Sequence, residues 1–375
     1  MAEQNTEHWI KPDALHHWVM QLWLAAGSSE LEARLTADHL VQANLSGHDS
    51  HGVGMIPAYV DSWMHGGLQL NQTVQIASDM GAMLTLDGQD GMGQVMAFQA
   101  MELAIERARI HGSCVMGLRN SHHLGRVGHW AEQAMASGMV AIHFTSARSK
   151  PVVAPHGGSE GRFVTNPFTV GLPRKNAPNL LLDFATSAIA AGKVRVAYNK
   201  QIDAPADCLI DHNGVPTLNP AALFDDPKGA LLTFAGHKGY ALAVMCELLS
   251  AALLGATTTR AETITSNFAV WNNMLTVVFD PSKMGDLLQF ESEAARFESW
   301  VKSTRLAPGS DKIRMPGDTE NESRLQRENG IPIDHGTVTL MNQAAALVSS
   351  RSIADLRMKN QSKLPDLPTE IRSPT

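Results

Sequence analysis

The sequence predicts an α/β (α+β) fold in which a helical N-terminal third is followed by a mixed β-sheet. Apolar residues recur at helical spacing as far as about His111. Short apolar runs, broken by Gly, Pro and Asn, then follow from Cys114 to Phe279. With 375 residues, 44% of them hydrophobic, the chain can bury a large core and has a length typical of two or three domains.

Four helices are predicted in the N-terminal third. The first has an apolar face made of Leu15, Trp18, Val19 and Leu22. The second begins at a capping box of Ser29 with Glu32 and runs to about Leu45, where Gly47 ends it. The other two are expected at Met55–Met64 and after the Gly91-Met-Gly93 break, the latter with Val95, Phe98, Met101 and Ile105 on one face.

The middle and the C-terminal part are predicted to alternate strands with helices. Strands of a mixed sheet are expected at Cys114–Leu118, Val140–Phe144, Phe168–Leu172, Leu180–Leu182 and Leu275–Phe279. Helices are expected at Val127–Ala136, Ala185–Val194, Gly239–Leu254, Leu287–Lys302 and Val338–Ser349. The polar, proline-containing segment from about Arg357 predicts a flexible tail.

Composition and charge argue against several classes of protein. The three cysteines are odd in number and far apart, so we expect neither a disulfide framework nor a CxxC metal site, and a cytoplasmic location. The polar N-terminus lacks the basic start and apolar run of a secretory signal. The most apolar stretch, Tyr240–Ala256, contains Glu247 and lacks basic flanks, which indicates a buried helix and no membrane span. A net charge of -7 with scattered cations argues against nucleic-acid binding.

Two histidine-rich turns are the best candidates for chemistry. His48 and His51 lie in GHDSHG, and His122 and His123 lie in NSHHLG. Both turns are flanked by glycine and adjoin predicted helices, which is where catalytic side chains are often presented. Imidazole can donate and accept a proton near neutral pH. A single histidine at such a place more often caps a helix, but two groups favour an acid–base centre.

Other chemistries fit the same residue types. His48, Asp49 and His51 offer nitrogen and oxygen ligands for a metal-dependent lyase or hydrolase, although the flanking glycines argue against the helix that would place both histidines on one face. Ser50, His51 and Asp183 could form a hydrolytic triad by residue type, but the sequence lacks a GxSxG elbow. We therefore expect no metal and assign Ser50 to orienting His51 or binding substrate.

A standard Rossmann site is not supported, because the nearest glycine pattern, Gly91-Met-Gly93, lacks the third glycine. Three predicted helix starts could instead hold a phosphate or carboxylate with their backbone N–H groups. These helix starts are Gly125-Arg126-Val127, Asp183-Phe-Ala-Thr-Ser187 and Gly236-His-Lys-Gly239, with Arg126 and Lys238 adding full positive charge.

Ordered segments over most of the chain resemble the type-2 malate/L-lactate dehydrogenase family. These segments are GHDSHGVGMIPAYV, NSHHLGRVGHWAEQA, PHGG, TNPF, LLDFATSAIAAGKVRVA, DHNGVPTLNP and HKGYALAVMCELLSAALLG. The resemblance spans roughly Ala37 to Asp334 and is strongest to the hydroxycarboxylate dehydrogenase B branch. It implies an oxidoreductase that interconverts a 2-hydroxy acid and its 2-oxo acid, either lactate- or malate-like or aromatic, such as hydroxyphenylpyruvate.

The resemblance also implies an architecture. Residues 81–284 are expected to form a non-Rossmann cofactor-binding domain with a largely antiparallel sheet. Residues 1–80 and 285–355 are expected to form a helical dimerisation domain, and 356–375 a tail. The active site would lie in the cleft between these parts of a homodimer. The cofactor would be NAD, with NADP as the alternative, and the substrate a small anionic acid.

Individual residues take their expected roles from the same resemblance. His123 matches the family's proton donor and acceptor, while Ser50, His51 and Asp183 match a catalytic relay. The positions that match cofactor contacts are His51, Gly125, Arg126, Val127, Asp183, Ala185, His237, Lys238, Asn272 and Gly317. Many members carry arginine where this chain has Met55, and commonly another at Ser46, so recognition of the substrate carboxylate must differ. A non-catalytic family member, which would not bind NADH, remains the alternative.

Overall fold

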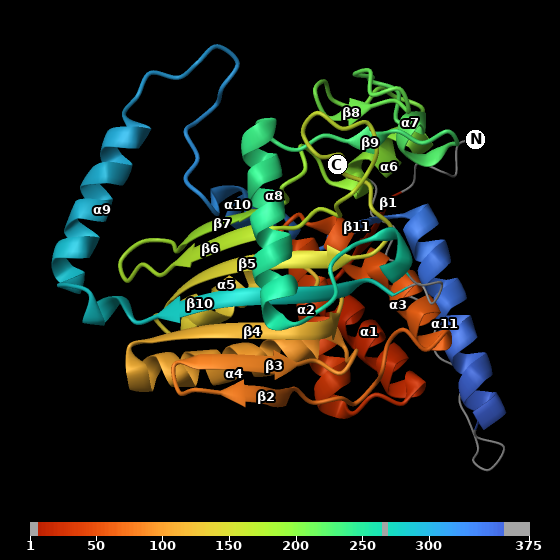
Figure 1. The fold of residues 1–375 in the computed structure, drawn as a ribbon, viewed down its shortest axis with the longest axis horizontal. Helices are drawn as coiled ribbons and strands as arrows, with labels where there is room; N and C mark the ends of the chain where they lie inside the picture. The colour runs from red at the N-terminus through yellow and green to blue at the C-terminus, as the bar shows by residue number, and fades with distance from the viewer. Residues whose placement is uncertain (1–6, 265–268, 356–375) are drawn as a thin grey trace.

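The centre of the computed structural model, which describes residues 7–264 and 269–355, is a seven-stranded sheet (Figure 1). Its strand order is β2-β3-β4-β10-β5-β6-β7. β3 and β4 run parallel, and the other five pairs in this sheet are antiparallel. The predicted mixed, largely antiparallel sheet is therefore confirmed, and it lacks the all-parallel order of a Rossmann fold.

The strands and helices have the following bounds. The central sheet contains β2 (Gln75–Asp79), β3 (Met83–Asp87), β4 (Ser113–His122), β5 (Val140–Arg148), β6 (Phe168–Leu172), β7 (Leu180–Phe184) and β10 (Trp271–Phe279). Two small sheets pair β1 (Glu7–Ile10) with β11 (Ile331–Asp334) and β8 (Leu209–Ile210) with β9 (Ala230–Leu231). The helices are α1 (Pro12–Ala26), α2 (Glu30–Leu45), α3 (Ile56–Met64), α4 (Gly93–His111), α5 (Gly128–Ala136), α6 (Ala191–Lys200), α7 (Ala221–Phe224), α8 (His237–Ser250), α9 (Leu287–Lys302), α10 (Asp318–Arg327) and α11 (His335–Asp355).

Helices cover both faces of the central sheet. α8 crosses one face over β5 and β10, while α4 and α5 pack against the other face (Figure 1). By length and apolar composition alone α8 could cross a membrane. Its inner face packs on the sheet, whereas Met245 and Leu248 on its outer face are 45% and 48% exposed. The predicted helix is thus present, but only one of its faces is buried.

The N-terminal and C-terminal segments pack against each other. β1 pairs with β11, and α11 contacts both α1 and α3. α9 stands apart from these helices at one edge of the molecule (Figure 1). The predicted division into 1–80, 81–284 and 285–355 stays a prediction. β2 falls on the helical side of the first boundary although it pairs with β3 in the sheet. The predicted tail lies outside the described residues.

Two sequence predictions need correction. Helices are expected to dominate as far as about His111, and no strand is predicted there, whereas the structure adds β1, β2 and β3. Every residue of β2 is exposed, so this edge strand carries no alternating apolar pattern that could reveal it. The helix predicted at Ala185–Val194 begins only at Ala191, because the segment before it is extended. There the Thr186 hydroxyl donates to the carbonyl oxygens of Thr165 and Asn166, both at 3.0 Å.

The N-terminus of α2 is capped as its sequence predicts, but only in part. The Glu32 backbone N–H donates to Ser29 Oγ at 3.2 Å. The reciprocal bond of a capping box is not formed, because the Ser29 N–H donates to Asn71 Oδ1 at 2.6 Å. The Glu32 carboxylate instead accepts from the Ser28 hydroxyl at 2.7 Å.

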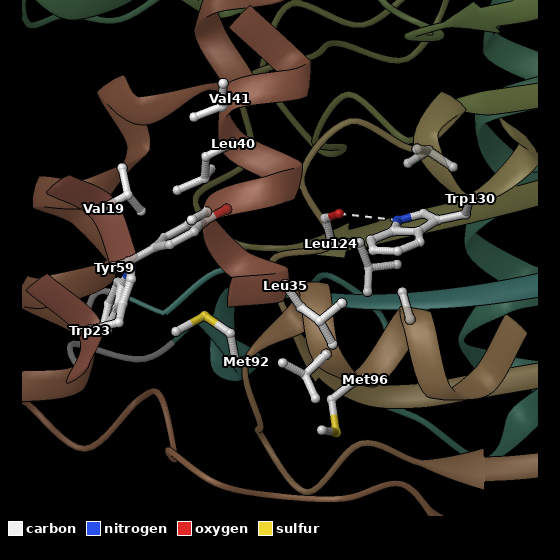
Figure 2. Close-up of a cluster of buried hydrophobic side chains, with 14 of the residues drawn as sticks. Val19, Trp23, Leu35, Leu40, Val41, Tyr59, Met92, Met96, Leu124 and Trp130 are labelled. Carbon is white, nitrogen blue, oxygen red and sulfur yellow. Dashed lines mark hydrogen bonds between the residues drawn. The ribbon is translucent and has the colours of Figure 1, made fainter. Parts of the chain in front are cut away.

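One large hydrophobic core joins the N-terminal helices to the sheet, and part of it is drawn in Figure 2. Trp130 of α5 is 1% exposed, and its indole N–H donates to the Leu124 carbonyl oxygen at 3.1 Å (Figure 2). Tyr59 of α3 is also 1% exposed. The segment after β4 is thus anchored in this core through Leu124.

Replacing Trp130 with Phe should destabilise the fold. The change removes the hydrogen bond to Leu124 and part of a buried ring, so the free energy of unfolding should fall by about 1–3 kcal/mol. Urea unfolding followed by circular dichroism measures this as a lower midpoint at unchanged slope. Trp9→Phe, in a strand where Trp9 is 38% exposed, is the matched control. An equal loss in both variants would contradict the anchoring role.

Candidate active site

The first histidine segment forms a short 3₁₀ turn, Asp49–His51, that is held from two sides. Asn44 of α2 donates to Asp49 Oδ1 at 2.7 Å and accepts the Val53 N–H at 2.9 Å. Arg327 of α10 donates to both Asp49 oxygens, at 2.7 and 3.1 Å. A Cβ at Gly52 would lie 2.1 Å from Asn44 Oδ1, so only glycine permits this close approach. The backbone next to His51 is therefore fixed.

One face of α10 connects this turn to α5. Glu320, Arg324 and Arg327 recur at helical spacing along α10. Glu320 Oε1 lies 3.2 Å from His48 Nε2, and Arg324 pairs with Glu132 of α5. Together with the Arg327–Asp49 pair, these contacts link three separate segments through one short helix.

The proposed metal ligands do not converge. His48 pairs with Glu320, and the Asp49 carboxylate is occupied by Arg327 and Asn44. Among residues 7–264 and 269–355, no three His, Cys, Asp or Glu side chains are grouped closely enough to hold a metal ion. The geometry therefore gives the metal-dependent lyase or hydrolase no support.

The second histidine segment follows β4 and is fixed by two asparagines of β10. Asn273 Oδ1 accepts the Asn120 N–H at 2.9 Å, and Asn272 Oδ1 accepts the Leu124 N–H at 2.8 Å. Asn272 also donates to the Ser146 carbonyl oxygen at 3.0 Å. The amide of Asn272, which the family resemblance suggests as a cofactor contact, is thus used within the protein to hold the turn around His123.

The start of α4 presses against the same turn. A Cβ at Gly93 would lie 2.1 Å from the His123 carbonyl oxygen and 2.5 Å from that of His122. Glycine is therefore required where the helix meets this backbone. The Gly91-Met-Gly93 sequence, which is an incomplete dinucleotide fingerprint, acts here as a packing contact.

The structure brings His51 and His123 together. Their ring centroids are 5.6 Å apart with an interplanar angle of 23°. Both residues are half-buried. His122 is only 1% exposed, and its Nε2 lies 3.0 Å from Ser62 Oγ inside the protein. Because His122 is buried and His48 pairs with Glu320, His51 and His123 are the candidates for contact with a ligand.

Burial keeps both of these rings neutral. Burial, together with a smaller effect of the nearby His48, lowers the pKa of His51 to about 4, although Asp183 opposes the shift. Burial also holds the pKa of His123 well below its ordinary value, with smaller contributions from His51 and His122. Both imidazoles are therefore uncharged at neutral pH.

Tyr59 and Gln94 support His123 from behind. Tyr59 Oη lies 2.6 Å from His123 Nδ1, and the Gln94 amide donates to Tyr59 Oη at 3.1 Å. Burial raises the pKa of Tyr59 well above its ordinary value, so its hydroxyl stays protonated. Our sequence reasoning missed both residues, since neither has a charge or a spacing that distinguishes it from core. The only signal is that Tyr59 falls within the GHDSHGVGMIPAYV segment.

The Ser50, His51 and Asp183 group is only partly assembled. Ser50 Oγ lies 3.0 Å from His51 Nδ1. The Asp183 oxygens accept from the Gly128 N–H at 2.9 Å and from the Thr169 hydroxyl at 2.8 Å. In a hydrolytic triad the carboxylate holds Nδ1 and leaves Nε2 for the serine. Here the serine occupies Nδ1, so the arrangement does not match a serine hydrolase.

Gly125, Arg126 and Val127 form the approach to α5, next to His123. Arg126 is 2% exposed, pairs with Glu132, and has Nε and Nη1 without a hydrogen-bond partner in the described part of the chain. The Gly128 N–H at the first turn of α5 meets Asp183 of β7. The Arg126 N–H likewise donates to His39 Nε2, at 2.9 Å, so what this helix start leaves incompletely bonded is the buried guanidinium.

The remaining predicted cofactor residues lie on three segments. His237 and Lys238 are exposed at the first turn of α8, after Gly236 in a left-handed conformation (φ 59°). Ala185 lies just after β7, not at a helix start as predicted. Gly317, with φ 95°, precedes α10 and lines a cavity of about 320 Å³ together with Glu132.

Comparison with known proteins agrees with this geometry. The family model described as malate/L-lactate dehydrogenase matches residues 10–342. The chain is 49% identical over 342 residues to hydroxycarboxylate dehydrogenase B of Escherichia coli K12, covering 90% of this chain and 94% of the relative. It is 38% identical over 300 residues to an L-lactate dehydrogenase of Cupriavidus necator, covering 80% and 86%.

Solved structures give the same result. A malate/lactate dehydrogenase structure from Escherichia coli superposes with a TM-score of 0.88 at 45% identity, covering 93% of this chain and 99% of the other. Malate dehydrogenase of Entamoeba histolytica gives a TM-score of 0.85 at 26% identity, covering 92% and 98%. The chain therefore belongs to the malate/L-lactate dehydrogenase family and is an oxidoreductase that interconverts 2-hydroxy and 2-oxo acids.

Proposed function

We propose that this oxidoreductase uses NAD(H) to reduce a 2-oxo acid, with His123 as the residue that exchanges a proton with the C2 oxygen. The observation that carries the proposal is the pairing of His123 with His51. Two neutral, half-buried imidazoles from distant segments face each other beside the start of α5. Such a pair suits proton exchange with a bound ligand better than helix capping.

The residues present fit a nicotinamide dinucleotide. Its phosphates need donors, and within the described residues the Nε and Nη1 atoms of Arg126, beside the start of α5, have no hydrogen-bond partner. The first turn of α8 adds Lys238, while Gly125 and Gly317, both with positive φ, remain predicted contacts. Other predicted cofactor contacts are His51, Val127, Asp183, Ala185 and His237. Asn272 is proposed to act indirectly, because its side chain holds the turn that carries His123.

When bound, the nicotinamide supplies the hydride that reduces C2, and the protein supplies the proton and the positioning. In reduction the Nε2 proton of His123 passes to the C2 oxygen as the hydride reaches C2, and the ring takes a replacement proton from solvent. Oxidation runs these steps backwards, so the ring gives its proton to solvent and takes that of the C2 hydroxyl. His51 packs against His123, and its ring is oriented by Ser50 at 3.0 Å. Asp183 lies near enough to raise the pKa of His51 slightly, and it fixes α5 through Gly128.

The substrate is proposed to be a 2-oxo acid with a larger or aromatic side chain. Met55 stands where many members of the family carry arginine, and it is half-buried against the core. A thioether packs well against apolar groups and rings but gives no positive charge for a second carboxylate. This favours an aromatic 2-oxo acid over oxaloacetate.

We also propose that the protein is a cytoplasmic homodimer. The three cysteines are free and buried, which suits a reducing compartment. α9 has no buried residue, and its Leu288, Phe297 and Trp300 side chains are 73%, 58% and 74% exposed. Large apolar side chains gathered on one projecting helix are typical of an interface, and a second copy of this chain is the proposed partner.

His123→Ala should abolish most turnover while leaving cofactor binding intact. Loss of a general acid costs typically about 100- to 10,000-fold in rate. Turnover is measured as NADH oxidation with a panel of aliphatic and aromatic 2-oxo acids, and NADH and NADPH affinity by fluorescence titration. His48→Ala, which removes an anchoring imidazole, is the control. Wild-type turnover in His123→Ala would contradict the assignment, and absence of nicotinamide binding by the wild type would favour a non-catalytic protein.

The pH profile should lack a histidine limb near neutrality. A buried imidazole whose pKa lies below 6.5 charges only as the pH falls through that lower value. With His51 at about 4 and His123 also well below its ordinary pKa, both stay neutral from about pH 5.5 to 8. The value of kcat/KM for the 2-oxo acid should be constant over this range. A limb with a midpoint near 6.5 that is absent in a His123 variant would contradict the neutral state.

Charges on α9 should separate the two copies. Phe297→Glu with Trp300→Glu places two carboxylates on the exposed apolar face, so light scattering after size exclusion should give the mass of one chain in place of two. Arg296→Glu, on the same helix at a polar position, is the control. A dimeric double variant would show that α9 is not the interface.

A further inference from the structure

Gln94, Tyr59 and His123 form a hydrogen-bond chain whose direction can be deduced. Gln94 Nε2 lies 3.1 Å from Tyr59 Oη, and Tyr59 Oη lies 2.6 Å from His123 Nδ1. Gln94 and Tyr59 are 0% and 1% exposed, so water does not compete for these contacts. In a neutral imidazole, one nitrogen carries the proton and the other accepts a hydrogen bond. The hydrogen bonds of Gln94 and Tyr59 determine which nitrogen of His123 carries the proton.

The amide orientation of Gln94 is fixed by the backbone of His123. Its Nε2 also faces the His123 carbonyl oxygen, at 3.4 Å. If the amide were reversed, Gln94 Oε1 would oppose that carbonyl oxygen, and two acceptors would meet in a buried place. Gln94 is therefore the donor to Tyr59 Oη.

The Tyr59 hydroxyl then has one available acceptor, His123 Nδ1. Oη already accepts from Gln94, and in the described part of the chain His123 Nδ1 is the other polar atom bonded to it. A buried hydroxyl proton without an acceptor would be costly, so it is donated to Nδ1. With Nδ1 as acceptor, the single proton of the neutral imidazole must lie on Nε2.

We infer that Gln94 and Tyr59 are positioning residues that hold the proton of His123 on Nε2, ready to be donated to the C2 oxygen of a 2-oxo acid. This inference rests on the proposed function of His123. A neutral imidazole N–H aimed at a carbonyl oxygen polarises it, a role known for histidines whose pKa is lowered. The hydrogen bonds of Gln94 and Tyr59 thus select the tautomer of His123 that can donate to the oxo acid.

The backbone of His123 is held in place independently of the Gln94–Tyr59 hydrogen bonds. Gly93 abuts the His123 carbonyl oxygen, and Asn272 binds the next backbone N–H, that of Leu124. Removing the Gln94 donor should therefore change where the imidazole proton lies more than where the ring lies. A Gln94 variant therefore tests the effect of the tautomer while the geometry of the turn is retained.

The tautomer can be read directly by NMR of the full-length protein labelled with ¹⁵N-histidine. Long-range ¹H–¹⁵N correlations at pH 7.5 distinguish Nε2–H from Nδ1–H, and the signals of His123 are those missing from His123→Gln. The expected wild-type result is Nε2–H. An Nδ1–H pattern in the wild type would overturn the inference, whatever the activity of the protein.

Two variants test the role of the chain. Gln94→Leu removes the donor and frees Tyr59 Oη to accept, so the Nδ1–H fraction of His123 should rise. The value of kcat should fall about 10- to 100-fold, the effect typical of losing a partner that orients a functional histidine, while KM and NADH affinity stay near wild type. Tyr59→Phe should lower kcat within the same range.

Gln133→Leu is the matched control. Gln133 lines the same cavity of about 330 Å³ as Gln94, but its amide donates to Phe98 and Glu102. It should retain the wild-type tautomer and kcat. Wild-type kcat in Gln94→Leu, or a changed tautomer without a change in kcat, would overturn the assigned role. If the wild type reduces no 2-oxo acid, the proposed function fails while the spectrum still decides the direction of the chain.

Discussion

The turn that carries His123 is wedged between the start of α4 and strand β10, and the rest of the site depends on this contact. Gly93 leaves no room for a side chain against the His123 carbonyl oxygen, and Asn272 binds the following N–H. The same turn leads directly into α5, whose first N–H groups meet Asp183. A displacement here would therefore move the His123 imidazole and the start of α5 together.

Ion pairs from α10, near the C-terminal end of the described chain, hold the turn that carries His51. α10 joins His48, Asp49 and Glu132 through three side chains on one face, so the C-terminal part fixes the turn that presents His51. The pairs are partly buried and form one network, which makes them stronger than isolated surface pairs. Burial keeps His51 and His123 neutral beside these charged pairs.

Much of this could be predicted from the sequence, and the exceptions have physical causes. The helical and strand periods located most elements, and grouping of histidines in glycine-flanked turns located both halves of the site. β2 escaped prediction because it is fully exposed, and α6 begins late because Thr186 binds backbone carbonyls. Tyr59, Gln94 and Arg324 could not be found, since their roles depend on contacts between segments far apart in the sequence. The structure also gives Asn272 a positioning role that the resemblance alone did not.

The central claim is that His123 contacts the oxygen at C2 of the substrate. A crystal structure with NADH and oxamate, an unreactive 2-oxo acid analogue, tests it most directly. The account predicts His123 Nε2 at about 2.6–3.2 Å from the keto-like oxygen of oxamate, with the nicotinamide beside it. Oxamate bound with that oxygen on His51, or away from both histidines, would contradict it.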